Sequence, residues 1–213
     1  MELRLFPLHT VLFPAMPIQL QVFEPRYRQL IAECLEHATP FGVALIREGV
    51  EVGGPAQPFE IGTSARITSV LPGSGERIHV RAVGVRRFRI VALHDDRPYP
   101  WADVEWVADT GAADEALVAQ ARTELALLLR LRATANGEYE RDAQLPAGAG
   151  AIADRIGALA DAHADEAQQL LEAVDIGQRL ELAVPLLRDA VERAYESAAE
   201  AALERWAAPG MAN

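Results

Sequence analysis

Every basic side chain in this 213-residue chain is an arginine, because the 20 Lys and Arg positions include no lysine. A P-loop needs a lysine to reach the terminal phosphates of a nucleotide, and a Ser-Lys dyad or a Schiff base needs the amine itself. These residues therefore exclude three widespread kinds of catalysis.

Gly148, Gly150 and Ala153 match the G-x-G-x-x-A spacing of a dinucleotide-binding turn. That turn binds a pyrophosphate only when a strand precedes it and a parallel strand follows its helix. Here the polar stretch 141–146 precedes the glycines, and a further helical pattern follows. We interpret the glycines as the start of a helix and predict no cofactor.

The histidines and the potential nucleophiles form no recognisable reactive set. No two of the five histidines stand at metal-ligand spacing on a helix, and the acidic neighbours of His94 and His163 are typical of solvated surface. No serine lies in a G-x-S-x-G setting, and Cys34 is the only cysteine. The sequence predicts no metal site, no catalytic residue and no enzyme activity.

Arginines concentrate near one predicted strand, where Arg81, Arg87 and Arg89 share the same parity. They could line one polar sheet face that binds an anion or RNA. The alternative is the solvated outer face of a barrel strand, which the absence of interleaved aromatic residues favours. The net charge of −11 divides into −1 for residues 1–106 and −10 for residues 107–213. We therefore do not expect nucleic-acid binding.

An apolar segment with two prolines, Val11–Ile18, cannot pair fully in a sheet. Part of it should lie in a loop or on an edge, where exposed Phe and Met side chains offer adaptable contacts to a polypeptide. The alternative is an ordinary loop folded onto the helical bundle. The candidate polypeptide-binding residues are Phe13, Pro14, Met16, Ile18 and Phe23.

The elements that must position these residues change type near Trp106. Before it, alternating or apolar runs predict strands over 18–22, 41–46, 66–71 and 77–90, with a turn at 72–75 and a bulge or bend at Gly84. One helix, from Pro25 to Ala38, interrupts them and buries Cys34 on its apolar stripe.

Beyond Trp106, alanine and leucine recur at helical spacing. Helices are predicted from about residue 114 to 133, through 152–159, from about Asp165 with Gln168 completing a capping box, and from Asp175 through Pro185. The fold class is α+β: a β-rich subdomain over 1–107 and an α-helical bundle over 108–213. No apolar stretch is long enough to span a membrane and no signal peptide is recognisable, so we expect a cytoplasmic protein.

Three segments together suggest a family. Leu5–Ile18 with Phe23–Arg28 resembles the opening of the Lon N-terminal domain, the substrate-binding module of ATP-dependent Lon proteases. The segments 84–90 with 98–104, and 168–175 with 179–180, resemble its later strands and its helical part.

This resemblance implies a PUA-like pseudo-barrel that contains one helix and is followed by a helical bundle. It also implies a noncatalytic module that binds unfolded or partner polypeptides, similar to small stand-alone bacterial proteins of this type. Neither ATP hydrolysis nor proteolysis carries over to a chain that reaches Asn213 without a lysine.

Overall fold

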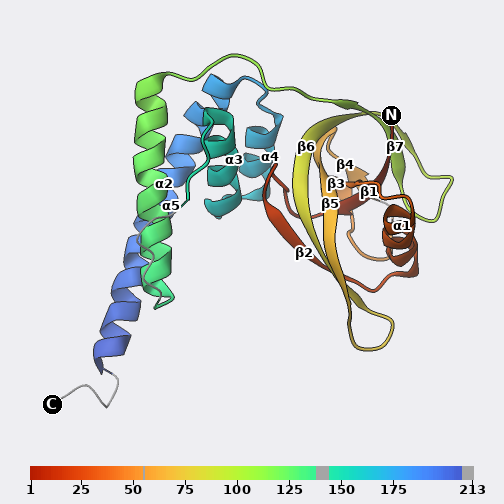
Figure 1. Ribbon diagram of the computed structural model, residues 1–213, viewed down its shortest axis with the longest axis horizontal. Helices are drawn as coiled ribbons and strands as arrows, with labels where there is room; N and C mark the ends of the chain where they lie inside the picture. The colour runs from red at the N-terminus through yellow and green to blue at the C-terminus, as the bar shows by residue number, and fades with distance from the viewer. Residues whose placement is uncertain (55, 138–143, 208–213) are drawn as a thin grey trace. The chain divides into compact units, whose positions relative to one another are not determined.

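Strands from the first half of the chain close into a ring in the computed structural model, which describes residues 1–54, 56–137 and 144–207 (Figure 1). The ring consists of β1 (Glu2–Leu8), β3 (Phe41–Gly49), β5 (Ile61–Pro72), β6 (Ile78–His94) and β7 (Trp101–Trp106). β1 pairs with β7, β7 with β6, β6 with β5, and β5 with β3, all antiparallel. A parallel pairing of β3 with β1 completes the circle. The predicted pseudo-barrel is thus confirmed.

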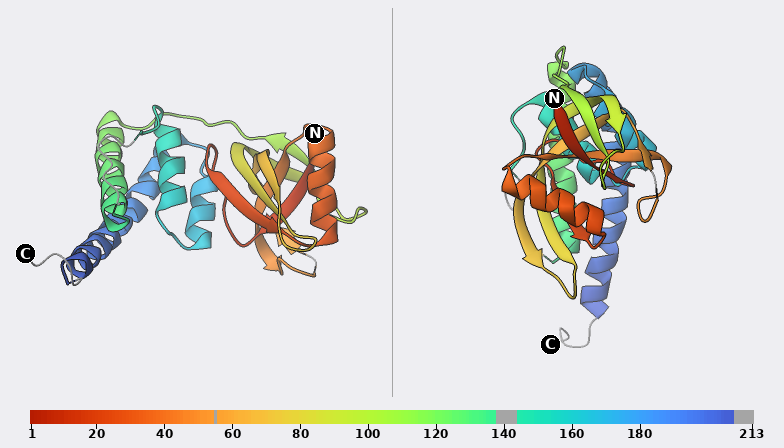
Figure 2. Two further views of the ribbon diagram at one scale, coloured as in Figure 1. Left: turned by 60° about the horizontal axis from the view of Figure 1, so that its bottom comes forward. Right: turned by 90° about the vertical axis from the view of Figure 1, so that its right-hand side faces the viewer.

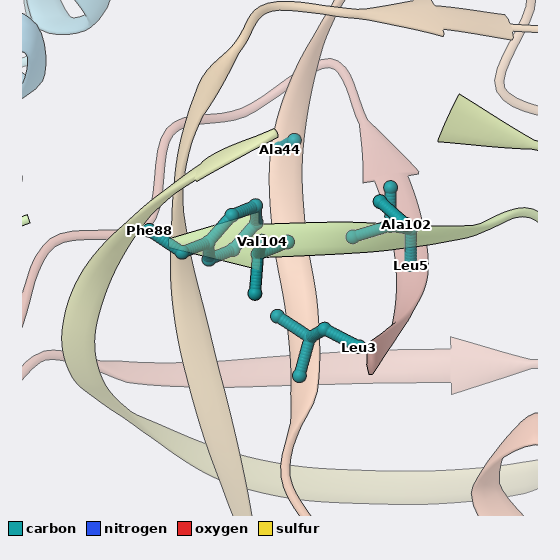
Figure 3. Close-up of a cluster of buried hydrophobic side chains, with 6 residues drawn as sticks. All are labelled: Leu3, Leu5, Ala44, Phe88, Ala102 and Val104. Carbon is teal, nitrogen blue, oxygen red and sulfur yellow. The ribbon is translucent and has the colours of Figure 1, made fainter. Parts of the chain in front are cut away.

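Small and branched apolar side chains fill part of the ring (Figure 3). Leu3 and Leu5 project from alternate positions of β1, and Ala102 and Val104 do the same from β7, because successive side chains of a strand point to opposite faces. Phe88 enters from β6, and none of these five side chains is more than 2% exposed. Burying each of the large ones contributes about 1.5–3 kcal/mol to folding.

Two further strands lie outside the ring. β2 (Pro17–Val22) pairs antiparallel with the first part of β6, in a register that runs from Pro17 opposite Val83 to Val22 opposite Ile78. β4 (Ala56–Pro58) pairs antiparallel with the end of β3. Within the described residues each of these short strands pairs with one neighbour, so each is an edge strand.

The helix predicted between the strands is α1 (Pro25–Glu36). It begins with a proline at its first turn, where the missing backbone N–H would have no helical partner in any case. Its buried face consists of Tyr27, Leu30, Ile31 and Cys34. The predicted burial of Cys34 is confirmed, since the residue is 1% exposed. Burial also raises the pKa of its thiol, because the apolar surroundings disfavour the thiolate.

The second half of the chain forms the predicted helices: α2 (Glu115–Ala135), α3 (Ala149–Leu159), α4 (Ala164–Glu172) and α5 (Ile176–Ala207). The long helices α2 and α5 lie side by side, as the views in Figure 2 show. The Asp114 side chain caps α2 by accepting hydrogen bonds from the backbone N–H groups of Ala116 and Leu117. Pro185 lies inside α5, which continues through it.

The chain divides into two units, and α4 belongs to the first. The strand-rich unit comprises Met1–Asp109 and His163–Val174, and the helical unit comprises Thr110–Ala162 and Asp175–Asn213. Two hydrogen bonds show why α4 joins the strands: Arg87 Nε donates to the Leu171 carbonyl at 2.9 Å, and Gln168 Nε2 donates to the Ile61 carbonyl at 3.0 Å. The structural division therefore differs from the predicted boundary between residues 107 and 108.

The start of α4 also differs from its prediction. The backbone N–H of His163 donates to Glu166 Oε2 at 3.0 Å, so the capping contact lies two residues before the predicted pair of Asp165 and Gln168. Gln168 is buried and serves the contact with Ile61 instead.

Three arginines make polar contacts that hold α3 within the helical unit. Arg179 of α5 is fully buried and pairs with Asp154 of α3 at 3.3 Å. The end of α3 is held by two more, since Arg132 Nη2 donates to the Leu159 carbonyl and Arg193 Nη2 to the Ala160 carbonyl, both at 2.6 Å. The two guanidinium groups thus donate hydrogen bonds to carbonyls at the end of the helix, which have no hydrogen-bond donor within the helix itself.

Candidate functional site

A cavity of about 400 Å³ runs along β2 in the strand-rich unit. Its lining comes from the end of β1 and the residues after it, from β2, from the start of α1 and from the segment after β3. The rings of Phe6 and Tyr27 stack within this lining with their centroids 4.1 Å apart, and both side chains are buried. Phe23 and Val52, in contrast, are 47% and 53% exposed. A recess with a buried aromatic floor and exposed apolar residues can take up apolar side chains of a partner.

Hydrogen bonds fix the segment after β3 beside this cavity. Glu24 Oε2 accepts from the backbone N–H of Gly53 at 3.3 Å, and Glu51 Oε2 accepts from the backbone N–H of His9 at 2.8 Å. Glu24 also pairs with Arg26 at 3.0 Å. The segment that carries Val52 is thereby tied both to the residue after β1 and to the residue before α1.

The cavity lining carries negative charge. Its acidic side chains are Glu24 and Glu51, it contains no arginine, and His9 is its one other titratable side chain apart from Tyr27. Arg26 compensates the charge of Glu24, whereas the contact described for Glu51 comes from a neutral peptide group. A bound group with a positive charge would therefore be favoured near Glu51.

Gly84 holds the segment between β1 and β2 against β6. Its N–H donates to the Met16 carbonyl and its own carbonyl accepts from the Ala15 N–H, both at 2.9 Å. A β-carbon at residue 84 would lie 2.3 Å from the Phe13 carbonyl oxygen, so this approach requires glycine. The ladder also shifts here, between the pairs Thr63–Arg87 and Ala65–Gly84. This register shift lies where the sequence predicts a bulge or a bend.

This anchoring corrects the predicted exposure of Phe13 and Met16, which are 1% and 8% exposed. Residues 11–16 do lie before the first paired residue of β2, Pro17, but the backbone bonds of Ala15 and Met16 to Gly84 fold the Phe13 and Met16 side chains inward. Pro14 is half-buried and lies outside the cavity lining. Ile18, half-buried, and Phe23, exposed, both line the cavity. The cavity thus brings together two of the five predicted residues.

The structure separates the three arginines predicted to share a face. Arg81 and Arg89 are exposed, but Arg87 is 4% exposed and donates to the Leu171 carbonyl and, at 3.1 Å, to Asp109 Oδ1. The bulge after Gly84 inserts a residue into β6 and reverses the parity beyond it. The prediction that Arg87 lies on the polar face is therefore wrong.

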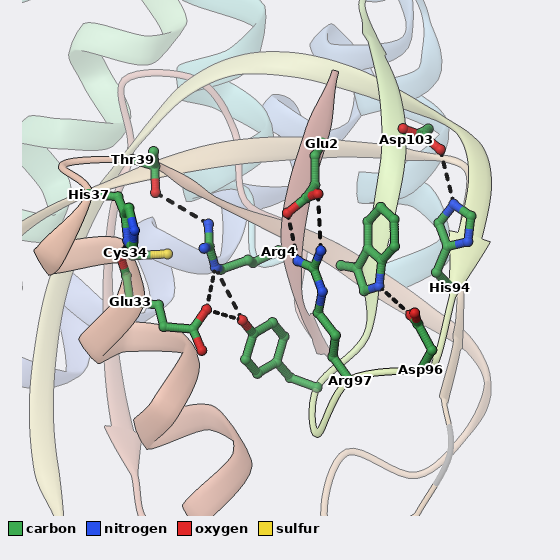
Figure 4. A network of polar contacts seen from close by, with 12 residues as sticks. Glu2, Arg4, Glu33, Cys34, His37, Thr39, His94, Asp96, Arg97 and Asp103 are labelled. Carbon is green, nitrogen blue, oxygen red and sulfur yellow. Dashed lines mark hydrogen bonds and ion pairs between the residues drawn. The ribbon is translucent and has the colours of Figure 1, made fainter.

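A polar network fastens α1 to β1 on another side of the strand-rich unit (Figure 4). Arg4 Nε donates to Glu33 Oε2 at 3.1 Å and to the Tyr99 hydroxyl at 3.2 Å, and that hydroxyl donates to Glu33. The hydrogen bonds from Tyr99 and Gln29, aided by Arg4, lower the pKa of Glu33 to about 2. The network supports α1 and, through it, Tyr27 in the cavity lining.

The acidic neighbours of His94 have structural contacts. The His94 ring stacks on Trp101 with centroids 4.0 Å apart, and its Nε2 lies 3.0 Å from Asp103 Oδ2 (Figure 4). Asp96 accepts a hydrogen bond from the Trp101 indole at 2.7 Å. Across the described residues no group of three or more His, Cys, Asp or Glu side chains could hold a metal ion. Gly148 of the G-x-G-x-x-A match is the N-cap of α3, and residues 144–148 before it form no strand.

Sequence reasoning missed Glu51, Val52 and Tyr27 as parts of the site. Val50-Glu51-Val52-Gly53-Gly54 does carry a signal, because two large apolar residues sit in a glycine-containing segment with no strand or helix period. Tyr27 was assigned correctly to the buried stripe of α1, but the stripe alone does not show that one end of it borders a cavity.

Comparison with known proteins places most of the chain in one family. The family model described as "ATP-dependent protease La (LON) substrate-binding domain" matches residues 2–189 of the sequence. The chain is 31% identical over 180 residues to a Lon protease of Syntrophus aciditrophicus, covering 81% of this chain and 23% of that protein. It is 30% identical over 190 residues to Lon protease 2 of Myxococcus xanthus, covering 84% and 22%. The chain thus spans less than a quarter of these relatives.

Solved structures show the same fold. The crystal structure of a Lon N-terminal domain protein from Xanthomonas campestris matches with a TM-score of 0.65 and 28% identity, covering 87% of this chain and 98% of that chain. The N-terminal domain of Mycobacterium avium complex Lon protease matches with a TM-score of 0.68 over 89% and 99% of the two chains, and its 22% identity supports the fold alone. In the described part of the chain, no helix combines the length and hydropathy that a membrane crossing requires.

Proposed function

This chain belongs to the family of the ATP-dependent protease La (LON) substrate-binding domain, and from that premise we propose that it is a noncatalytic module that binds unfolded polypeptide in the cavity along β2. One observation carries the proposal: Phe23 is 47% exposed and lines the same cavity as the buried, stacked rings of Phe6 and Tyr27. An exposed phenylalanine next to an apolar recess gains most when a partner's apolar side chains remove both from water.

The composition of the chain supports a role without catalysis. No lysine occurs in these 213 residues, so they can form neither a Ser-Lys dyad nor the lysine contact of a P-loop. The strongly lowered pKa of Glu33 has a structural cause, because its partners Tyr99 and Arg4 tie α1 to the strands. Binding without bond-making needs only the apolar recess and its edge.

The alternative function, RNA or anion binding by Arg81, Arg87 and Arg89, has less support. The Arg87 guanidinium already donates hydrogen bonds to the Leu171 carbonyl and to Asp109. Its exposed neighbour Arg86 stacks over the Trp106 ring, with the guanidinium carbon 3.4 Å from the ring centroid. The two exposed arginines that remain, Arg81 and Arg89, make a weaker electrostatic footprint than a basic stripe.

Titration of a reduced and alkylated protein, which stays unfolded in buffer, tests the proposal by fluorescence anisotropy. Phe23→Ser and Val52→Ser should each raise the Kd about 10-fold or more, since loss of an apolar anchor costs about 2 kcal/mol of binding. Val91→Ser is the matched control, because Val91 is 60% exposed on β6 and does not line this cavity. Thermal melts should show all three variants folded.

Two results would contradict the proposal. The first is that the unfolded protein fails to bind the wild-type chain at all. The second is that Val91→Ser weakens binding as much as Phe23→Ser does, which would assign binding to a general apolar surface rather than to this cavity.

A further inference from the structure

β2 presents one backbone edge that no described strand covers. Its pairing with β6 extends over its whole length, from Pro17 to Val22, and the described part of the chain contains no second partner for it. An uncovered strand edge offers a row of peptide N–H and C=O groups to an additional strand.

The register identifies which backbone groups lie on that edge. One position before β2, the Gly84 N–H donates to the Met16 carbonyl and the Gly84 carbonyl accepts from the Ala15 N–H, so both backbone groups of Gly84 point toward the segment that leads into β2. In an antiparallel ladder, pairs whose backbone groups point toward each other alternate with pairs whose N–H and C=O groups point away from the partner strand. Pro17, which has no N–H, opposes Val83 at the next position and fits a pair of the second kind. By the same alternation, the backbone groups of Gln19 and Gln21 point away from β6.

The cavity lies on this same side. Every residue from Ile18 to Glu24 contributes to its lining, whereas no residue of β6 does, although β6 is hydrogen-bonded to β2. A recess above the face of the sheet would include side chains of the neighbouring strand as well. The lining therefore follows the free edge of β2, and the exposed Phe23 stands at its end.

We propose that an extended segment of the bound polypeptide adds to β2 as a further strand, exchanging backbone hydrogen bonds with Gln19 and Gln21 while its alternate apolar side chains fill the cavity. The proposal rests on the polypeptide-binding function and specifies its mode. Strand addition explains how such a site accepts many sequences, because the backbone contacts do not depend on side-chain identity.

The charge of the cavity lining favours a particular kind of added segment. Glu51 lines the cavity and its described partner is the neutral N–H of His9, while Arg26 already compensates Glu24. A cationic side chain on the added strand would complement this carboxylate, and an acidic one would be repelled. The preferred segment is therefore extended, apolar at alternate positions and basic.

Backbone methylation tests the strand addition directly. The probe is a capped nine-residue peptide in which valine and serine alternate and the central residue is arginine. Two derivatives carry two N-methyl groups each, either on odd-numbered or on even-numbered residues, so that each blocks one edge of the peptide. One derivative should lose at least about 10-fold in affinity for the full chain and the other less than about 3-fold, because backbone hydrogen bonds to the protein are lost on one edge of the peptide only.

Amide exchange of the protein gives a second readout. On binding of the unmethylated peptide, the N–H groups of Gln19 and Gln21 should exchange markedly more slowly in NMR, whereas those of Ile18 and Leu20, which point toward β6, should change little. Equal effects of the two methylation patterns, with no change at Gln19 and Gln21, would overturn strand addition.

The failure of this inference differs from the failure of the proposed function. Binding of the unfolded protein, together with equal affinities of the two methylated peptides, would keep the polypeptide-binding function and remove the strand mode. If neither the unfolded protein nor the parent peptide binds, the function itself is wrong.

The charge preference has its own test. Replacing the central arginine of the peptide by glutamate should weaken binding about 5-fold or more, and Glu51→Gln should abolish most of that difference. Glutamine keeps an oxygen that can accept from the His9 N–H. Glu48→Gln is the control, because Glu48 is exposed on β3 outside the cavity lining. Equal binding of the two peptides to the wild-type chain would overturn the preference for a basic segment.

Discussion

The α-carbon of Gly84 lies so close to the carbonyl of Phe13 that a β-carbon at residue 84 would come within 2.3 Å of its oxygen. The contact involves backbone on both sides, so a side-chain rotation cannot relieve it. It decides where the whole segment before β2 lies, and with it the start of the strand that borders the cavity.

Gly84→Ala should therefore destabilise the chain by about 2 kcal/mol or more, since overpacking against fixed backbone forces the segment to move. Gly54→Ala is the control: its added β-carbon would meet only the side chain of Val50, which is 51% exposed and can turn away. Urea denaturation of both variants measures the difference. Equal stability of the two variants would show that the segment adapts freely.

Phe13 and Phe23 should respond oppositely to truncation. Phe13→Ala removes a ring that is 1% exposed and should cost about 3–5 kcal/mol of unfolding free energy. Phe23→Ala removes a ring that is 47% exposed and should change stability by only about 0.5 kcal/mol. Denaturant titrations report both values, and a larger loss for Phe23 would contradict the assignment of Phe13 to the core.

Stability should fall in acid partly through Glu33. Hydrogen bonds from Tyr99 and Gln29 lower the pKa of Glu33 to about 2 from its ordinary 4.5, so its carboxylate stabilises the folded chain above pH 4.5 and loses this effect as the pH falls toward 2. Glu33→Gln should thus be about 1 kcal/mol less stable at pH 7, and the gap should narrow between pH 4.5 and 2.

Denaturation curves across that range check the expectation for Glu33. Glu36→Gln, an exposed change on the same helix, controls for the loss of one negative charge. A gap that stays constant down to pH 2 for Glu33→Gln would mean that its carboxylate is not the stabilising form.

The buried pair of Asp154 and Arg179 should show strong coupling. Asp154→Ala leaves a fully buried guanidinium without this partner and should cost about 3–5 kcal/mol. Adding Arg179→Leu should recover part of the loss, because the buried charge that has lost Asp154 is removed as well. A double-mutant cycle from thermal or urea unfolding measures the coupling, and simple additivity of the two losses would contradict it.

Periodicity predicted most of the fold because each pattern follows from local geometry. Strict alternation over Ile18–Val22 and the three-and-four spacing around Cys34 both describe a single element and its buried face, and both elements form as predicted. The ring closure came from the family resemblance, since alternation does not say which strand pairs with which.

The candidate site was harder to predict, because it depends on long-range contacts. Arg87 has the parity of Arg81 in the sequence, yet one bulge turns it inward to a carbonyl of α4. Phe13 lies in a proline-containing segment typical of an exposed loop, yet Gly84 draws it inside. Hydropathy also gives no indication that Glu51 borders the cavity, since the contact that places it comes from a residue 42 positions away.

The interrupted course of the strand-rich unit has a consequence for how the chain matures on the ribosome. Its last piece, α4, follows more than fifty residues of the helical unit, so the strand-rich unit is incomplete until Val174 has been synthesised. A nascent chain or proteolytic fragment that stops near Asp109 would leave the guanidinium of Arg87 without the carbonyl of Leu171. By the time that carbonyl emerges from the ribosome, α2 and α3 have already been synthesised. Because each unit consists of two separate segments of the chain, a single proteolytic cut releases neither unit intact.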